Sequence, residues 1–557
     1  MVATNRCLLW TGLSVIISAR VAASSDSRSL LSNLGTVLGT KQAKAIEQRA
    51  SALQESLHAI FATVPKNNAG MLERPVVRYV LHRFFMQLGW SIRGLEPAGQ
   101  AWSSGSPTDV LREQLPKQAV DLLESRFDSD GFALQDAAVL AAVFKHLVHG
   151  ENVARLQASY RAHQLQHGAT LDEESAQRVL DTYLAGYVLG KNLSSMSADE
   201  IHGLEWDIAK RYGNWRKIQE LARDIMRSLL GNGGVSLPGL KRVVDEIGER
   251  FGREENSECQ ARKHELMEIE RQGTGRVRLA NFYRIALHEG KWHFGESTGY
   301  LRQLGCLDES SPDDLQVIIP NYVNSKSNCV DPSAFYSVCC LNECDGLLES
   351  LERDLRAVAA TPTEIAALVA ALPSATVPAN RTLPAVLIRR LQAVAESHGG
   401  LVPLHGRLFA QWMHHAYPRE CPFPHISGTT SPLRVEDWAA EPGNEVVAAK
   451  EEMLQHISAP RPPPQRHAFE GSEAGECAPW MEEEELLAPY GLPPAAPGSV
   501  RESMQMGMEA SWLAVAAVAS LAALASGVTR LLKVSDISGA GRSHGGKQAQ
   551  EPVIYSV

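Results

Sequence analysis

The sequence predicts an all-α fold, with a helical ectodomain, a disulfide-rich segment and one transmembrane helix. Apolar residues recur at helical spacing, as in Leu53, Leu57, Ile60 and Val64, which fall on one helix face. Runs of β-branched residues with strict apolar–polar alternation, the pattern of half-buried strands, are scarce throughout. An uncharged apolar run near the end of the sequence adds the membrane span.

Patterns typical of membrane targeting lie near both ends of the sequence. Arg6 precedes an apolar run and then small residues, the order of a secretory signal, so we expect cleavage after Ala23. Residues 510–529 contain no charged residue and would span about 30 Å as a helix, the thickness of a bilayer's hydrocarbon core. Arg530 and Lys533 follow at once, and basic residues favour the cytoplasmic side. We therefore expect a single-pass type I protein of an endomembrane or the plasma membrane, with its N-terminus luminal or extracellular.

Composition divides the chain into seven segments, and the ectodomain is long enough for two or three domains. The expected segments are a signal peptide (1–23), an N-terminal helical domain (24–190), a pair of helix–loop–helix units (191–305), a Cys/His-rich helical domain (306–440), a disordered acidic and proline-rich stalk (441–509), a transmembrane helix (510–529) and a cytoplasmic tail (530–557).

Charge and sequons limit the classes of partner. The net charge of -10 on 557 residues is mild and argues against general nucleic-acid binding. We expect a membrane-embedded protein with an unknown protein partner and no nucleic acid. Asn192 and Asn380 stand in N-x-S/T triplets and are candidate glycosylation sites on the luminal side.

Two further helices are expected in the first domain. Pro75 opens an apolar helix, because proline suits the first helical turn, and Gly89 ends it. Residues Val139 to Val148 are apolar over a wide arc, which predicts a buried helix.

A short unit recurs between helices, in which a glycine precedes an apolar residue and a leucine. The instances are Gly131-Phe-Ala-Leu134, Gly168-Ala-Thr-Leu171, Gly234-Val-Ser-Leu237, Gly275-Arg-Val-Arg-Leu279 and, more loosely, Gly400-Leu-Val-Pro-Leu404. Phe132 and Ala169, and likewise Val235 and Val277, are about 40 residues apart, which suits paired helix–loop–helix units. We expect each loop of a pair to contribute a short strand to its partner.

The clearest unit, Cys259 to Leu287, resembles an EF-hand, and its calcium positions fall on a set of mostly uncharged residues. Those positions are Glu270, Gln272, Thr274, the carbonyl of Arg276, and Asn281. A working loop needs several carboxylates and a bidentate glutamate in the last position, whereas here only Glu270 is charged. A degenerate, structural EF-hand-like pair is therefore favoured over a calcium site, and we expect no cofactor, with calcium as the alternative.

A second acidic loop allows the same two interpretations. In the frame set by Phe132, Ser125 takes the first calcium position and Asp136 the last, with Asp128 and Asp130 between them. Aspartate and serine at such a place more often cap a helix or form a turn. A single weak calcium site is the alternative.

Once the signal is removed, eight cysteines remain, an even number that favours disulfides on the luminal side. The disulfide candidates are Cys259, Cys306, Cys329, Cys339, Cys340, Cys344 and Cys421, with Cys477 in the stalk left to pair between chains or to fold back. Cys340 and Cys344 would share a helix face, and adjacent Cys339 and Cys340 rarely bridge each other. Cys306 and Cys421 are therefore candidate partners for this segment. A zinc site built from Cys329, Cys340 and Cys344 is the alternative.

Four histidines between His405 and His425 invite a metal interpretation. If residues 406–416 form a helix, His405 and His414 lie about 180° apart around its axis, and His414 and His415 about 100°. Neither pair converges, so a buried aromatic helix is favoured over a copper or zinc site. The sequence also contains no G-x-S-x-G, Walker or H-E-x-x-H motif.

Three stretches carry a family resemblance. They are LGWSIRGLEPAGQAW at 88–102, NYVNSKSNC with FYSVCCLNEC, and GRLFAQWMHHAYPRECPFPHISGTTSP. Together they resemble a family of uncharacterised dinoflagellate single-pass membrane proteins with degenerate EF-hand-like units, and the resemblance covers most of Glu73 to Trp438. It implies the fold and topology, but no activity, substrate or catalytic residue.

The function expected from the sequence is non-catalytic: a type I membrane protein whose disulfide-stabilised helical ectodomain binds another macromolecule. Two alternatives stay open. One is a calcium-responsive luminal protein that works through the loop from Asp128 to Asp136 or through that from Glu270 to Asn281. The other is a metalloenzyme that uses the region from His405 to His425.

Overall fold

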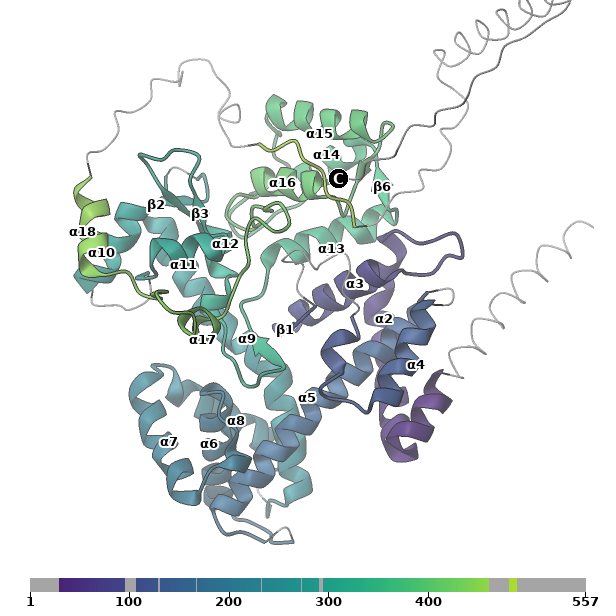
Figure 1. Cartoon of the computed structure of the whole chain (residues 1–557), viewed down its shortest axis with the longest axis vertical. Coiled ribbons are helices and arrows are strands. Elements are labelled where there is room, and N and C mark those ends of the chain that lie inside the picture. Colours follow the sequence, from purple (N-terminus) through teal and green to yellow (C-terminus); the bar gives the residue numbers. More distant parts are fainter. Residues whose placement is uncertain are drawn as a thin grey trace, which may run out of the picture. The chain divides into compact units, whose positions relative to one another are not determined.

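The chain is mostly helical, as the sequence predicts, and carries a few very short strands (Figure 1). This computed structural model describes residues 30–95, 107–128, 131–166, 168–231, 233–271, 273–289, 294–459 and 480–487. All of them belong to one unit of the chain, residues 1–490. The predicted signal peptide, transmembrane helix and tail lie outside the described residues, and no helix within them is both long enough and apolar enough to cross a bilayer.

Helices of very different length alternate with short strands along the described residues. The helices are α2 (Thr40–Thr63), α3 (Arg74–Gln87), α4 (Lys117–Asp128), α5 (Leu134–Ala162), α6 (Glu173–Val188), α7 (Ala198–Arg211), α8 (Trp215–Leu230), α9 (Leu237–Glu268), α10 (Leu279–Glu289), α11 (Thr298–Gln303), α12 (Ile319–Val323), α13 (Glu343–Leu355), α14 (Pro362–Ala371), α15 (Ala385–Ser397), α16 (Arg407–Ala416), α17 (Val435–Ala439) and α18 (Lys450–Ser458). The strands are β1 (Trp90–Ile92), β2 (Arg276–Arg278), β3 (Leu307–Asp308), β4 (Gln316–Ile318), β5 (Tyr336–Val338), β6 (Ala359–Ala360) and β7 (Val402–Pro403).

Helix starts follow the local sequence. Asp172 caps α6 by accepting the N–H of Ser175 at 2.7 Å, because an exposed helix start leaves its first N–H groups unpaired. Ser197 and Glu200 form a reciprocal capping box at the start of α7. Pro75 lies in the first turn of α3, which confirms the helix predicted there. The predicted buried helix is also confirmed, since Val139 to Phe144 are all buried within α5.

Short antiparallel contacts join the loops between helices in pairs. Among the described residues Leu72 pairs with Phe132 and Leu171 with Val235 through isolated bridges. The later loops pair through strands: Val277 of β2 with Val317 of β4, and Ala360 of β6 with Val402 of β7. Each pair therefore links two helix–loop–helix units, the first of them α2–α3 with α4–α5.

The sequence did not predict correctly which of these loops pair with each other. Phe132 pairs with Leu72 and not with Ala169, and Val235 pairs with Leu171 and not with Val277. The reason is the length of the helices between the expected partners. α5 has 29 residues and α9 has 32, so each holds the loops at its two ends about 45 Å apart. Two loops at opposite ends of one helix cannot bridge each other.

The largest apolar core lies among α2, α3, α5, α6, α8, α9 and β5. Phe85, Trp90 and Phe144 form its aromatic centre, with the Phe85 and Phe144 ring centroids 5.7 Å apart. α9 lies close to the end of α3 at a contact between two glycines, Gly252 and Gly89. A Cβ on Gly252 would lie 2.8 Å from the Leu88 carbonyl oxygen, and Gly89 has a positive φ of 76°, so the close approach depends on both glycines.

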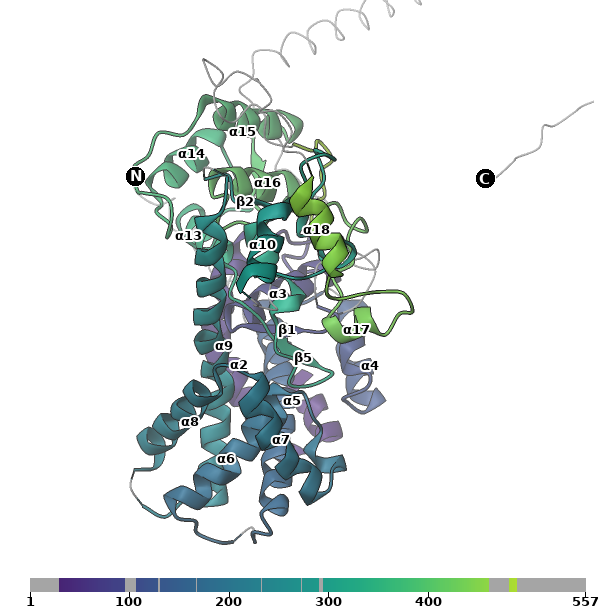
Figure 2. The same cartoon turned by 90° about the vertical axis from the view of Figure 1, so that its left-hand side faces the viewer.

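Two smaller cores lie in the later part of the chain. One gathers α10, α11, α12, α18 and the end of α9, and the other gathers α13 to α16. Figure 2 shows α6, α7 and α8 grouped beside α5, where a fourth small cluster joins α7 to the end of α5.

Disulfides join Cys259 with Cys340, Cys329 with Cys339, and Cys344 with Cys421. Cys421 is thus a partner of the cysteine segment, whereas the same expectation for Cys306 was wrong. Cys306 is buried in the core around α10 to α12 and forms no disulfide with another described cysteine.

Two further expectations about the cysteines were wrong, and one lies outside the described residues. Cys340 and Cys344 do not share a helix face, because Asn342 caps α13 by accepting the N–H of Cys344, so that Cys340 precedes the helix. The alternative zinc site is excluded, since Cys329, Cys340 and Cys344 are all disulfide-bonded. Cys477 lies outside the described residues.

Part of the predicted stalk is folded. α18 packs beside α10 (Figure 1), with Met453 buried in the neighbouring core. Residues 480–487 lie against α16, where the Arg407 side chain donates to the carbonyl oxygens of Met481 and Glu483. Composition alone suggested an extended segment, but a few apolar residues and one arginine anchor these two stretches.

Candidate functional site

In the expected calcium loop around Asp128, arginine side chains pair with the carboxylates. The guanidinium of Arg74 lies 2.6 Å from an Asp128 oxygen and 3.1 Å from a Glu124 oxygen. Asp136 is buried and accepts the backbone N–H of Ala133 at 3.1 Å, with Arg126 at 3.3 Å. Asp130 lies outside the described residues. The described carboxylates therefore cap α5 and pair with cations instead of converging on one point.

In the expected calcium loop from Glu270 to Asn281, Glu270 is likewise paired with an arginine. Both of its oxygens accept hydrogen bonds from Arg419, at 2.8 and 2.9 Å, which is the strong bidentate geometry. The Arg276 carbonyl accepts the N–H of Arg271 at 3.0 Å, and Asn281 accepts from Arg284 at 2.8 Å. The chain forms a turn at Thr274, but the neighbouring groups at the expected calcium positions bind other groups of the protein.

Gly275 is required for the sharp turn of this loop. It has a φ of 69°, and a Cβ there would lie 1.9 Å from the carbonyl oxygen of Pro418, so only glycine fits. The adjacent strand then carries Arg276 and Arg278, which pair with Asp308 at 2.7 Å and with Asp314 at 2.5 Å across the sheet. Gln272 lies outside the described residues. Arginine side chains thus provide the positive charge that a metal ion provides in a calcium loop.

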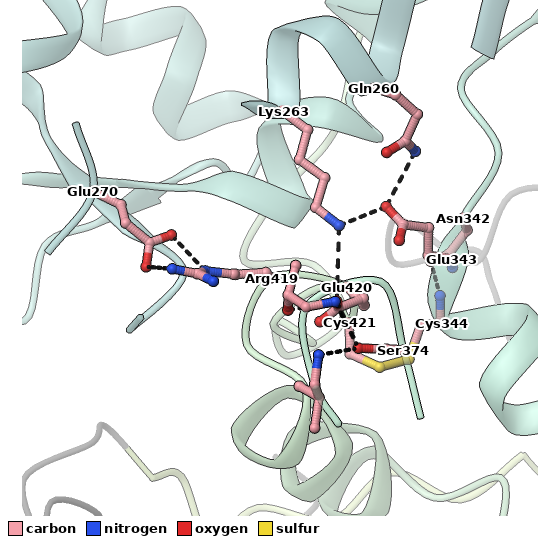
Figure 3. Close-up of polar contacts among 12 residues, drawn as sticks. Gln260, Lys263, Glu270, Asn342, Glu343, Cys344, Ser374, Arg419, Glu420 and Cys421 are labelled. Carbon is pink, nitrogen blue, oxygen red and sulfur yellow. Dashed lines mark hydrogen bonds and ion pairs between the residues drawn. A yellow bond between two sulfur atoms is a disulfide. The ribbon is translucent and has the colours of Figure 1, made fainter. Parts of the chain in front are cut away.

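A buried polar cluster surrounds the Cys344–Cys421 disulfide (Figure 3). Lys263 of α9 is 2% exposed and donates to Glu343 of α13 at 2.7 Å. Glu420, beside Cys421, accepts from the Ser374 hydroxyl at 2.8 Å and lies 4.0 Å from Lys263. The ammonium group is therefore enclosed by two carboxylates and joins α9 to the helices of the last core.

The histidines between His405 and His425 have separate partners. His414 is fully buried; its Nδ1 donates to the Cys421 carbonyl at 2.7 Å, while its Nε2 accepts from Arg276 at 3.2 Å. Burial and the neighbouring Arg276 hold the pKa of His414 well below its usual value. The His425 ring donates to the carbonyl of Gly305 at 2.7 Å. This geometry favours structural histidines over the expected alternative of a metal centre here.

His405 belongs to a buried cluster of ionisable side chains. Its Nδ1 lies 3.1 Å from the Tyr79 hydroxyl and its Nε2 lies 3.4 Å from Glu352, which Arg83 binds through two hydrogen bonds. Burial, with the charge of Arg83, lowers the pKa of His405 to about 3, and burial raises the pKa of Asp345 to about 6. A cavity of about 20 Å³ adjoins Glu352, room for about one water, so the cluster is sealed from substrates.

A pocket with a volume of about 230 Å³ lies between α2, α5, α9 and β1. Lys145 pairs there with Glu249 at 2.7 Å and lies over the ring of Trp90. His149 and Asp245 form a second pair, at 2.5 Å. Paired charges beside an aromatic ring suit a small polar ligand, although each charge already has a partner in the protein.

A different group has metal-ligand geometry, and it was not predicted from the sequence. One ring nitrogen each of His163 and His202 and one oxygen of Glu205 all lie within 4.8 Å of one another. The residues come from the end of α5 and from α7. The only local signal of this group is His-x-x-Glu at 202–205, two residues that share one helix face.

Both candidate glycosylation residues lie on the surface. Asn192 is exposed and accepts the N–H of Ser194 at 3.1 Å, and Asn380 is exposed with a φ of 56°. Their positions are compatible with modification.

Comparisons with protein-family models, with curated proteins and with solved structures find no match to this chain. Its function must therefore be inferred from its own residues.

Proposed function

We propose that this chain is a non-catalytic, calcium-independent scaffold of degenerate EF-hand-like units, held by disulfides, that binds another macromolecule. In this proposal the chain is a single-pass type I membrane protein, and the scaffold is its ectodomain. The paired loops support the EF-hand-like interpretation. Each pair joins two helix–loop–helix units by antiparallel contacts centred on an apolar residue, as between Val277 and Val317.

The observation that carries calcium independence is the arginine pairing of the loop carboxylates. Glu270 and Asp128 are bound by Arg419 and Arg74, so a calcium ion would have to displace a guanidinium from each. In the loop of Glu270 one carboxylate is also too few, because calcium needs six to eight oxygen ligands, and in the loop of Asp128 the carboxylate of Asp136 is buried and caps α5. The loops therefore retain their geometry without the ion.

Calorimetric titration of the oxidised protein with calcium tests this part. We expect no saturable heat at millimolar calcium, above the dissociation constants of weak extracellular modules. Arg419→Ala is the matched variant, because it releases Glu270 from its partner without changing a loop residue. A saturable calcium isotherm for the wild-type protein would overturn the proposal.

Native electrophoresis of the full chain, extracted in mild detergent from the cells that make it, tests partner binding. We expect a discrete species heavier than the chain, unchanged by calcium removal and lost on reduction of the disulfides. Migration as a single chain under all conditions would refute a macromolecular partner.

A second candidate function is the binding of a small polar ligand in the pocket beside Trp90. The ion pair of Lys145 with Glu249, the contact of His149 with Asp245 and a volume of about 230 Å³ support it. A ligand found by thermal-shift screening should raise the melting temperature of the wild-type protein but not that of Lys145→Met. An equal shift in both proteins would remove this candidate.

A further inference from the structure

We propose that His163, His202 and Glu205 form a binding site for zinc or a similar divalent transition-metal ion, with one coordination position open to solvent. Their ligand atoms lie within 4.8 Å of one another. Tetrahedral zinc with bonds near 2.0–2.1 Å places its ligand atoms about 3.3 Å apart. Binding therefore requires the three side chains to close by about 1.5 Å at most, which small side-chain rotations supply.

The elements that carry the three residues are fixed locally. His163 directly follows α5, and the next residue, Gln164, has a φ of 55°, which turns the chain away. His202 and Glu205 are three residues apart on α7 and so project from the same face. α7 packs on α6 and on the end of α5 through a small apolar cluster that includes Leu204 and Ile208.

Thr182 of α6 orients two of the ligands. Its hydroxyl lies 2.7 Å from Nε2 of His163 and donates to Glu205. Thr182 is itself only 1% exposed, so its position is fixed by packing. Such outer-shell hydrogen bonds hold imidazole and carboxylate ligands of metal sites in their productive orientation.

Two charged side chains near the group bear on the binding of a cation. Glu205 supplies a negative charge as one of the three ligands. The nearby Arg178 is paired with Glu174 at 2.9 Å, which reduces its repulsion toward a cation.

The donor set selects the class of ion. Two imidazoles and one carboxylate suit zinc and its neighbours in the transition series, whereas calcium and magnesium need more oxygen ligands. Three protein ligands leave a fourth position of a tetrahedral ion for water. His202 is exposed, so solvent reaches this position.

Titration of the full chain, oxidised and without a polyhistidine tag, against a chromophoric zinc chelator tests the proposal. We expect one high-affinity zinc per chain, with affinity reduced at least about tenfold in His202→Ala and in Glu205→Gln, and by about tenfold in Thr182→Val. His58→Ala, an exposed histidine on α2, is the matched control and should bind zinc as the wild type does.

Cobalt substitution adds a readout that does not depend on the variants. Co²⁺ bound to the wild-type protein should show the ligand-field absorption of a four- or five-coordinate site with nitrogen donors. Circular dichroism checks that His202→Ala stays folded. The proposal is overturned if no stoichiometric zinc binds, if both ligand variants bind as His58→Ala does, or if the cobalt spectrum is that of the hydrated ion.

Discussion

The parts of the chain before and after Cys259 are stabilised in different ways. The earlier part has one large apolar core, which also includes β5 of the later part, and a small cluster around α7. The sequence contains no cysteine between Cys7 and Cys259. The later part divides its apolar residues between two smaller cores and carries the three described disulfides. Small cores bury too little surface to be secure alone, so covalent links make up the difference.

The loops of the two parts also differ in how they pair. The two bridges of the earlier part, such as Leu171 with Val235, consist of single residue pairs. The later sheet of β2, β3 and β4 is longer and is flanked by the ion pairs of Arg276 and Arg278. The earlier pair of Leu72 with Phe132 also has arginine pairing beside it, through Arg74 with Asp128. The loops of the two parts therefore differ in the length of their antiparallel pairing and not in the use of arginine.

The largest effects should come from removing either of the two long-range disulfides. Cys344–Cys421 has a sequence separation of 77 and Cys259–Cys340 one of 81, whereas Cys329–Cys339 has one of 10. Loop-closure entropy assigns about 4.5 kcal/mol to each long link and about 2.7 kcal/mol to the short one. We expect urea unfolding of the double serine variants to show this order. An equal loss in all three variants would contradict a cross-linking role that scales with the loop.

A cavity in the earlier core should cost slightly less. Phe144 is fully buried among Phe85 and Phe335, so Phe144→Ala should lower the free energy of unfolding by about 4 kcal/mol. Most of the loss should persist when the disulfides are reduced, because Phe144 packs mainly in the cysteine-free part, with Phe335 of the loop closed by Cys329–Cys339 as a partner from the later part. A loss that disappears on reduction would mean that the two parts are not independently stabilised.

The buried ion pair that joins the two parts should rank third. Arg83 of α3 is bound to Glu352 of α13, and Arg83→Met would leave that carboxylate without its cation. We expect a loss of about 3 kcal/mol at neutral pH. The double variant Arg83→Met/Glu352→Met should recover part of it, as measured by chemical denaturation, because Asp345, 3.7 Å from Arg83, still loses its cation. No recovery would show that packing, and not charge, explains the loss.

The pH dependence at His405 should be smaller but specific in sign. Its folded pKa is about 3, and an unfolded histidine titrates near 6.5, so between these values the unfolded chain binds a proton that the folded chain does not. The stability due to His405 is therefore complete above pH 6.5 and falls toward pH 3, by at most about 1.4 kcal/mol per unit.

His405→Gln isolates this slope. The difference in unfolding free energy between wild type and variant should shrink on acidification from pH 6.5. Asp345, with its pKa raised to about 6, acts in the opposite direction, since its protonation stabilises the folded state as pH falls from 6 toward 3.8. Asp345 is present in both proteins, so its contribution cancels in the difference. A difference that does not change with pH would refute a neutral buried His405.

The sequence was sufficient for features that rest on local pattern. The spacing of Leu53 and Leu57, the proline that opens α3 and the turn glycine Gly275 each act through neighbouring residues, and the structure has them as expected. Loop pairing was not predictable in this way. It depends on α5 and α9 each running without interruption through two units, which no local signal marks.

Sites that assemble distant residues were missed for the same reason. His163 follows α5, whereas His202 and Glu205 are unremarkable polar residues on the amphipathic helix α7. Disulfide partners also required the fold, since eight cysteines allow 105 pairings. The stalk was misread in part, because composition does not register a few anchoring contacts such as that of Arg407 with residues 480–487.

The most direct test of the central claim is the melting temperature of the oxidised protein with millimolar calcium and with the same concentration of magnesium. Ligand that binds only the folded state raises the melting temperature, so a working calcium loop would reveal itself. We predict the same melting temperature in both ions, and a marked decrease when the disulfides are reduced. A rise of several degrees that is specific to calcium would contradict the account.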